Sequence, residues 1–358
     1  MKRAAFARIN LSYLKNNLAI IRKIANQSKI MAVVKADAYG HGTLHVCKSL
    51  TDVDAFAVAH VNEALELRGY GIKQPIVALQ GFNNSDGLLN AIEQNVQLVL
   101  HNKEQLKILK NCKNEKPLSV YLKIDTGMHR LGFSGHEFGE ILAEIKSLLP
   151  SGSIIRLMTH LACADEVDNP MTQQQIEQFD QLIIDKSHEQ SIANSAGILA
   201  WPNSHRDWVR PGLAMYGISP LHDTAMPNEL MLRPIMSLHA PLISIKACKK
   251  GEIVGYGGDF CCPGDMLIGI IAIGYADGYP RHLKSTPSVA IGANKVPLVG
   301  RVSMDMIAVD LTGVDAKVGQ IAELWGESIS VADVAAHAET ISYELLCAAG
   351  NSVYKNYI

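Results

Sequence analysis

Residues 30–42 read IMAVVKADAYGHG, an apolar run of strand type that ends at a charged amine, Lys35. Apolar residues on both faces are typical of a parallel strand that is covered on both sides. A lysine at the end of one such strand is, taken alone, more often a solvated side chain than a functional group. The residues that follow the other strands therefore decide how Lys35 is interpreted.

Short apolar runs alternate with segments of helical periodicity over the first two-thirds of the chain. Helices are predicted at 11–25, with Asn10 as the N-cap, and at 172–185. The alternation favours a parallel sheet, and eight strands within about 210 residues are typical of a (β/α)8 TIM-type barrel. A doubly wound parallel sheet is the alternative. The predicted strands are 29–36, 54–60, 75–81, 96–100, 118–125, 153–161, 191–195 and 207–212.

The pattern changes near residue 233, where helical periodicity fades and glycine, proline and aspartate turns separate short strands. Such a pattern predicts a mostly antiparallel β domain, with helix returning only at 330–338. We therefore divide the chain into residues 1–232 and 233–358, and we expect the first strand, about 2–9, to pack with the second domain. The later strands are predicted within 240–248, 252–258, 266–278, 288–300 and 303–311.

Composition argues against several classes of function. The net charge of -2 and the pI of about 6.7 indicate no nucleic-acid partner. The most apolar window, 267–276, is too short to cross a membrane, and Arg8 and Asn10 interrupt the basic start, so we expect no signal peptide. The seven cysteines are odd in number and form no C-x-x-C motif. We therefore expect a reduced, cytoplasmic protein without a metal site.

Polar residues that suit catalysis stand at or just after the predicted strands. In a parallel barrel the carboxyl ends of the strands meet at one mouth, where catalytic groups gather. Each residue alone has an ordinary explanation, such as a structural histidine or a surface ion pair, but their convergence on one mouth favours a site. The residues are Lys35, Asp125, Thr126, Gly127, Arg130, His160, Asn194, Ser195, Arg210, Gly212 and Leu213.

The chemistry of this set suggests pyridoxal phosphate (PLP). A lysine amine in a closed barrel mouth is desolvated, which lowers its pKa and makes it a nucleophile toward an aldehyde. The hydroxyl of Ser195 and the backbone N–H groups of Gly212 and Leu213 suit a phosphate. Arg210 is placed to meet a ring nitrogen.

Nine motifs then make the chain similar to the alanine racemase family, which are PLP enzymes of fold type III. They span essentially the whole chain and stand in the family's order: AVVKADAYGHG, KIDTGMHRLGF, THLACADE, NSAG, VRPGLAMYG, VGYGGDF, IGYADGYPR, VGRVSMD and TISYELLC. His129, in TGMHR, departs from the smaller or amide residue expected of the family.

The resemblance implies that residues 1–232 bind the cofactor. Lys35 would carry PLP covalently, Arg210 would bind its ring nitrogen, and His160 would lie nearby. The remaining cofactor contacts implied are Tyr39, Asn194, Ser195, Gly212, Leu213 and Tyr343.

The resemblance further implies a homodimer with shared active sites, in which Tyr256 serves the partner's barrel as the second catalytic base. Arg130 and the backbone of Met304 would bind the substrate carboxylate, and Lys123 would carry a carbamate that braces Arg130. The supporting residues implied along the substrate corridor and beside it are Asp165, Tyr275, Arg281, Arg301, Asp305 and Ile341.

The expected reaction is the interconversion of L-alanine and D-alanine, with Lys35 and Tyr256 as bases on opposite faces of the substrate. The D-alanine would either supply peptidoglycan or be catabolised, and both uses stay open. A PLP-dependent amino-acid decarboxylase of the same fold is one alternative, against which the VGYGG and IGYADG motifs argue. A non-catalytic PLP-binding protein is the other, and the residues after 233 argue against it.

Overall fold

The computed structural model describes residues 4–183, 185–221 and 231–358, which fall into two compact units. The barrel unit comprises Lys15–Ala36 and Thr43–Leu232. The carboxy-terminal unit comprises the chain up to Leu14, Asp37–Gly42 and Arg233–Ile358. The short segment Asp37–Gly42 thus groups with residues far along the chain. We keep 1–232 and 233–358 as the proposed domain limits.

In the described residues, the barrel unit is built on eight parallel strands that close into a ring, because β5 pairs with β6 and β10 pairs with β2. The closed ring confirms the predicted (β/α)8 barrel and excludes the doubly wound sheet. A short strand, β7 (Phe133–Ser134), pairs in parallel with the carboxyl end of β6. The ring strands are β2 (Lys29–Val33), β3 (Ala55–Val58), β4 (Ile76–Ala78), β5 (Val96–Leu100), β6 (Ser119–Asp125), β8 (Ile154–Met158), β9 (Gln190–Ser191) and β10 (Trp208–Val209).

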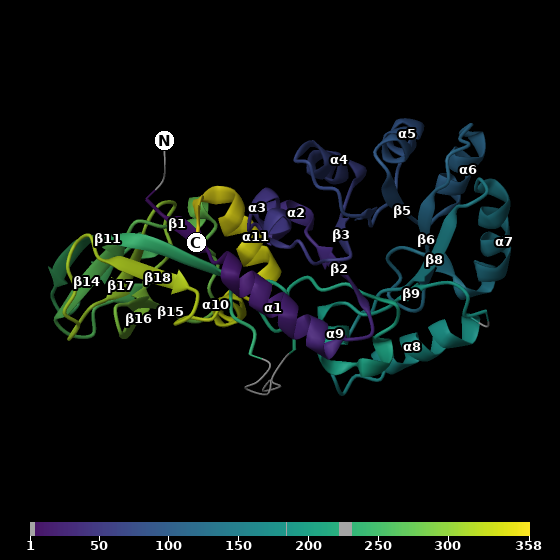
Figure 1. The fold of residues 1–358 in the computed structure, drawn as a ribbon. Helices are drawn as coiled ribbons and strands as arrows, with labels where there is room; N and C mark the ends of the chain where they lie inside the picture. Colours follow the sequence, from purple (N-terminus) through teal and green to yellow (C-terminus); the bar gives the residue numbers. More distant parts are fainter. Residues whose placement is uncertain (1–3, 184, 222–230) are drawn as a thin grey trace. The chain divides into compact units, whose positions relative to one another are not determined.

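Helices lie outside the barrel strands (Figure 1). Helix α1 (Leu11–Ile24) begins as predicted, because the Asn10 side chain accepts hydrogen bonds from the amides of Ser12 and Tyr13. Helix α8 (Met171–Leu182) ends before residue 185, the predicted limit. The others are α3 (Thr43–Ser49), α4 (Val61–Gly69), α5 (Ser85–Glu93), α6 (Lys103–Asn111), α7 (Phe138–Leu148) and α9 (Ser195–Ala200), with 3-10 turns η1 (Gly135–Glu137) and η2 (Pro202–Ser204).

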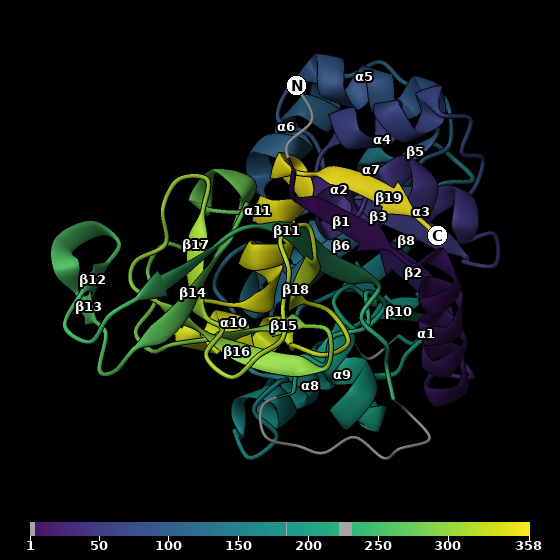
Figure 2. The same ribbon diagram turned by 90° about the vertical axis from the view of Figure 1, so that its left-hand side faces the viewer.

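Among the described residues of the carboxy-terminal unit, six antiparallel strands form a second closed ring, since β14 pairs with both β17 and β11. Strand β1 (Phe6–Ile9) joins this sheet between β11 and β19 (Tyr354–Tyr357), as Figure 2 shows. Residues 2 and 3 of the predicted first strand lie outside the described residues. The six strands are β11 (Met236–Cys248), β14 (Met266–Ile271), β15 (Ser288–Ile291), β16 (Asn294–Val299), β17 (Ile307–Asp310) and β18 (Ile321–Trp325).

Three details of this unit differ from the prediction. Helix returns twice, as α10 (Val331–His337) and as α11 (Ser342–Ser352), so the prediction of a single late helix was wrong. Strands β18 and β19 were not predicted. The predicted strand 252–258 is only β12 (Ile253–Val254), which is followed by a 3-10 turn, η4 (Tyr256–Gly258), and by β13 (Phe260–Cys261). A similar turn, η5 (Tyr275–Asp277), follows β14.

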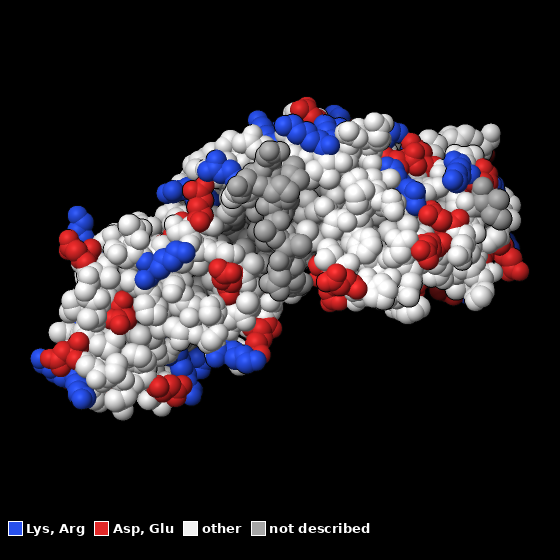
Figure 3. Space-filling view, turned by 90° about the horizontal axis from the view of Figure 1, so that it is seen from below, with Lys and Arg blue, Asp and Glu red and all other residues white. Residues whose placement is uncertain are grey.

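The surface carries both signs of charge. Acidic and basic side chains are interspersed on the face shown in Figure 3. Among the described residues, we find no helix whose length and apolar character would let it cross a membrane.

Candidate active site

Charged residues stand at the carboxyl ends of several barrel strands, as the sequence predicts. Lys35 follows β2 by two residues, and Arg210 directly follows β10. Lys123 and Asp125 both belong to β6, and residues two apart on a strand share a face. His160 lies two residues beyond β8. The barrel topology therefore brings these side chains to one mouth.

Arg210 is buried, and hydrogen bonds to groups of the described residues fix its guanidinium. Its Nη1 donates to Ser191 Oγ at 2.6 Å, and its Nη2 donates to the carbonyls of Thr159 at 2.7 Å and Ile192 at 3.0 Å. The same Nη2 lies 3.1 Å from His160 Nδ1. Burial lowers the pKa of Arg210 to about 10, which still leaves the guanidinium charged at neutral pH.

His160 lies among cations. Burial lowers its pKa well below the usual range, and the charges of Arg210, Lys123, Arg130 and Lys35 lower it further. The imidazole is therefore neutral at neutral pH, and Nδ1 accepts from Arg210. A mouth with this concentration of positive charge favours an anionic ligand.

The positive charges that act on His160 also act on Lys123. Its side chain is buried, and burial, Arg210 and Arg130 together lower its pKa to about 8, although the carboxylate of Asp125 acts in the opposite direction. A substantial share of Lys123 is therefore a neutral amine near pH 8, which is a nucleophile.

A second part of the mouth offers hydroxyl and backbone donors. Ser195 Oγ accepts from the amides of Gly212 at 2.8 Å and Ala214 at 3.3 Å. Asn194 caps α9 by accepting from the Gly197 amide at 2.9 Å. Ser195, Gly212 and Leu213 are all buried, and the hydrogen bond from the Gly212 amide to Ser195 Oγ brings these three of the predicted phosphate contacts together within the barrel unit.

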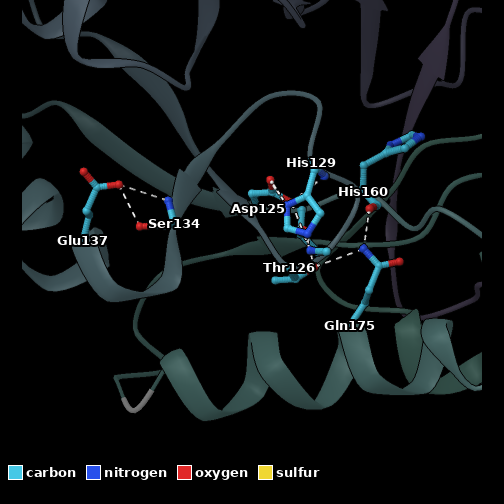
Figure 4. Close-up of polar contacts among 9 residues, drawn as sticks. Asp125, Thr126, His129, Ser134, Glu137, His160 and Gln175 are labelled. Atoms are coloured by element: carbon cyan, nitrogen blue, oxygen red, sulfur yellow. Dashed lines mark hydrogen bonds and ion pairs between the residues drawn. The ribbon is translucent and has the colours of Figure 1, made fainter.

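Asp125 organises the loop that leads to Arg130. Its carboxylate accepts from the amides of Gly127 and His129, each at 3.0 Å, and from His129 Nδ1 at 3.1 Å (Figure 4). Burial opposes ionisation of Asp125, but these hydrogen bonds lower its pKa overall. His129 has a left-handed φ of 52°, so the residue that departs from the family pattern also closes this turn.

The sequence did not single out a buried hydrogen-bond chain beneath this loop. Thr126 Oγ1 and Thr159 Oγ1 are 2.8 Å apart. Gln175 Nε2 donates to Thr126 Oγ1 at 3.3 Å and to the His160 carbonyl at 3.0 Å (Figure 4). Gln175 thereby ties helix α8 to two strand ends. Nothing distinguishes it in the sequence from its neighbours Gln173 and Gln174.

The chain turns in a left-handed sense directly after Lys35. In α2 (Lys35–Tyr39), residues Ala36–Tyr39 have φ between 51° and 55°. Each non-glycine residue in this conformation costs about 1–2 kcal/mol. Glu63 holds the start of the turn, because its Oε1 accepts from the Ala36 amide at 2.9 Å.

Tyr39 and Tyr343 meet within the carboxy-terminal unit, where their ring centroids are 5.6 Å apart. Tyr39 is buried, and burial, with smaller effects from Tyr343 and Cys347, raises its pKa. The Tyr39 hydroxyl therefore stays protonated at neutral pH and is able to donate a hydrogen bond.

Tyr256 stands on the loop between β12 and β13, and its side chain is 69% exposed. Arg301 lies against this loop, because a Cβ added to Gly257 would sit 3.0 Å from the Arg301 Cζ. Asp259 accepts two hydrogen bonds from the Arg301 guanidinium.

A neighbouring group of predicted residues surrounds η5. The amides of Tyr275 and Ala276 donate to the carbonyls of Ser303 and Met304 at 3.1 and 3.0 Å. Arg281 lies 5.8 Å from the centroid of the Tyr275 ring. Met304, Asp305 and Ile341 are exposed on this unit, whereas Asp165 lies in the barrel unit, in the segment between β8 and α8.

The predicted residues therefore form two sets, each described within its own unit. The barrel unit holds Lys35, Lys123, Arg130, His160, Asp165, Asn194, Ser195, Arg210, Gly212 and Leu213. The carboxy-terminal unit holds Tyr39, Tyr256, Tyr275, Arg281, Arg301, Met304, Asp305, Ile341 and Tyr343.

Comparison with known proteins gives a consistent result across the chain. Residues 9–220 match the family model "Alanine racemase, N-terminal domain", and residues 235–357 match "Alanine racemase, C-terminal domain". Alanine racemase from Shewanella woodyi is 45% identical over 348 residues, which cover 97% of each chain.

Solved structures agree with these matches. The biosynthetic alanine racemase from Pseudomonas aeruginosa superposes with a TM-score of 0.95 at 40% identity, covering 100% of both chains. Alanine racemase from Bartonella henselae, whose structure has covalently bound pyridoxal phosphate, superposes with a TM-score of 0.88 at 27% identity, covering 99% of each chain.

Proposed function

The chain belongs to the alanine racemase family, and from this premise we propose that it interconverts L-alanine and D-alanine with PLP as cofactor. The observation that carries the proposal is the group at the carboxyl ends of the barrel strands, in which Lys35 follows β2, Arg210 follows β10 and Ser195 Oγ lies 2.8 Å from the Gly212 amide nitrogen. This group suits both an anionic cofactor and a substrate carboxylate. The comparisons favour neither a decarboxylase nor a non-catalytic carrier.

The residues at the mouth fit PLP. When bound, the cofactor supplies an electron-withdrawing ring that stabilises negative charge at the substrate Cα. Lys35 would hold its aldehyde carbon covalently, and Ser195, with the amides of Gly212 and Leu213, would hold its phosphate. Tyr39 and Tyr343 would complete the phosphate contacts, and Asn194 would fix the start of α9 beside them.

Arg210 would fix the ring. Within the described part of the chain its hydrogen bonds run from Nη1 and Nη2, so Nε is the donor we assign to the ring nitrogen. A guanidinium has donors only, and it therefore gives the ring nitrogen a hydrogen bond while remaining charged. His160, which accepts from Nη2, holds the plane of the guanidinium.

Two side chains would move the proton. Racemisation removes the Cα proton on one face of the substrate and returns a proton on the other, which a single fixed base does poorly. We assign the D-side proton to the Lys35 amine and the L-side proton to the Tyr256 hydroxyl. The corridor to these bases would be lined by Asp165, Tyr275, Arg281, Arg301 and Ile341, and Asp305 would support the site.

The substrate carboxylate would be bound by Arg130 and the Met304 amide. An ammonium on Lys123 would repel Arg130, whereas a carbamate would attract it. The lowered pKa of Lys123, about 8, supports carbamate formation, because only the neutral amine reacts with carbon dioxide.

We further assign the active form to a homodimer in which Tyr256 serves the partner's barrel. The side chains of Tyr256, Met304 and Ile341 are 69%, 54% and 59% exposed in the single chain. Large apolar side chains that are exposed on one chain become buried when an interface covers them. A second copy of the chain is the partner that would cover them.

The decisive experiment is to incubate the purified protein with L-alanine and PLP and to follow D-alanine with D-amino-acid oxidase. We expect D-alanine to accumulate until the two enantiomers are equal in concentration. Carbon dioxide release without D-alanine would instead favour the decarboxylase. Stoichiometric PLP binding without turnover would favour the carrier.

A further inference from the structure

The left-handed turn Ala36–Tyr39 needs contacts that hold it, because consecutive non-glycine residues in that conformation persist only where their surroundings fix them. Glu63 fixes the beginning of the turn. The remainder belongs to the carboxy-terminal unit, and its contacts there are with the last helix and the last strand of the chain.

The first of these contacts is an ion pair between Asp37 and Lys355. Lys355 Nζ donates to Asp37 Oδ2 at 2.6 Å. The Lys355 side chain is 18% exposed and the Asp37 side chain is 40% exposed. Lys355 lies on β19, where it pairs with Ala7 of β1. Its backbone is therefore held by the sheet (Figure 2), and the ammonium is presented to Asp37 from a fixed strand.

The second group of contacts is made by glycines at the end of the turn and on α11. A Cβ on Gly40 would lie 2.3 Å from the Leu346 carbonyl oxygen of α11, and a Cβ on Gly350 would lie 2.0 Å from the Gly40 oxygen. A Cβ on Gly42 would lie 1.9 Å from Tyr357 Oη. These glycines allow the end of the turn to lie directly against α11 and β19.

We propose that Lys355 is a positioning residue for Lys35, because its ion pair with Asp37 holds the turn that immediately follows the cofactor lysine. The inference rests on the proposed function, in which Lys35 holds PLP. His41, which lies nearby, does not substitute for Lys355. Burial lowers the pKa of His41 to about 4, so that imidazole is neutral at neutral pH. Lys355 thus supplies a positive charge to Asp37 that His41 does not.

The test uses the Lys355→Met holoenzyme, in which the side-chain length is kept and the charge is lost. We expect PLP to dissociate between two- and fivefold faster, the size of effect that a partly exposed ion pair produces. We also expect faster amide hydrogen exchange in peptides covering 36–42. Lys355→Arg should restore both values, because it restores the charge.

A matched control is available in the same unit. Lys284 forms an ion pair with Glu339 at 2.7 Å, and Lys284→Met removes that pair without touching the turn. We expect Lys284→Met to retain PLP as the unchanged protein does. If Lys355→Met does not fold, Asp37→Asn removes the same ion pair from the other side with almost no change of shape.

Two outcomes overturn different claims. Borohydride fixation of PLP followed by peptide mapping should label Lys35 in the unchanged protein, and a label elsewhere would overturn the proposed function. If Lys35 is labelled but Lys355→Met or Asp37→Asn matches Lys284→Met in PLP release and in exchange at 36–42, the positioning role of Lys355 is wrong.

Discussion

The guanidinium of Arg301 forms two hydrogen bonds with the carboxylate of Asp259, which lies on the same loop as Tyr256. Nη2 donates to Oδ1 at 3.1 Å, and Nε donates to Oδ2. The loop itself is weakly constrained, because Gly255, Gly257 and Gly258 all have positive φ. The ion pair therefore supplies rigidity that the glycines do not.

Loss of this pair should impair catalysis without affecting cofactor binding. We expect Asp259→Ala to lower kcat/KM by roughly tenfold, because small displacements of a catalytic group carry large rate costs. The loss must be equal for L-alanine and D-alanine, since enantiomers have the same free energy and the equilibrium constant is one. Steady-state kinetics in both directions, with a PLP titration, measure this. A change in PLP affinity alone would contradict the prediction.

Lys35→Ala should abolish both covalent PLP attachment and racemisation. The expected loss of kcat is at least about 10³-fold, because both the attachment point and one base disappear. Lys29→Ala is the matched control: Lys29 begins the same strand that Lys35 follows, and it pairs with Glu189 at 2.5 Å. The control should keep the visible absorbance of bound PLP. Near-native turnover by Lys35→Ala would refute the assignment.

We expect a carbamate on Lys123 to make activity depend on bicarbonate and pH. Its pKa is lowered to about 8 from 10.5, so the neutral amine is scarce well below pH 8 and abundant above it. We expect protein freed of carbon dioxide to show a raised KM for alanine, and added bicarbonate to restore it more fully above pH 8 than below. Lys123→Met should not respond. A crystal structure with an unmodified Lys123 and no anion beside it would refute the carbamate.

Glu189 should contribute acid-sensitive stability to the barrel. Burial opposes its ionisation, but hydrogen bonds from Lys29, Arg156 and Trp208 lower its pKa from 4.5 to about 2. A lowered carboxyl pKa stabilises the fold fully above about pH 4.5, and this contribution is lost as the pH falls toward 2. Glu189→Gln should therefore cost about 1–3 kcal/mol of unfolding free energy at neutral pH.

Denaturant unfolding at several pH values measures this contribution. The difference between Glu189→Gln and the unchanged protein should shrink as the pH falls through the window from 4.5 to 2. Glu104→Gln, which removes the exposed pair with Lys107, is the control and should have little effect at any pH. A difference for Glu189→Gln that does not depend on pH would show that the carboxylate charge is not responsible.

The barrel was predictable because its signals are local. Most barrel strands lie in short apolar runs, the charged site residues of the barrel unit lie within these strands or after them, and Asn10 precedes α1 as a cap. Helix α11 was missed because its apolar residues, such as Leu345 and Leu346, are few and follow a β-rich region. The left-handed turn after Lys35 was also missed, since Asp37 and Lys355 are 318 residues apart and no periodicity links them.

The buried polar contacts could not be predicted from the sequence, for a different reason. Gln175 sits in a helix among other glutamines, where such side chains are normally solvated, and only the fold shows that it is buried against Thr126. Conversely, Tyr256 was identified through its motif, although its exposed side chain alone would indicate an ordinary surface tyrosine.

The last prediction concerns the partner that Tyr256 serves. If each active site combines Lys35 of one subunit with Tyr256 of the other, a Lys35→Ala subunit still contributes a good tyrosine. A Tyr256→Ala subunit likewise contributes a good lysine. Each mutant homodimer should be nearly inactive, because every site has one lesion. In the heterodimer, one site receives both lesions and the other receives none.

Co-expression of the two mutants with different tags, followed by purification of the doubly tagged species, isolates this heterodimer. We expect about half of the unchanged activity per dimer, taking the two sites as independent. Activity of the unchanged enzyme should also fall on dilution below the dimer dissociation constant, because the complete site exists only in the dimer. A heterodimer as inactive as its parents would show that each site is built within one chain, with Tyr256 serving its own barrel.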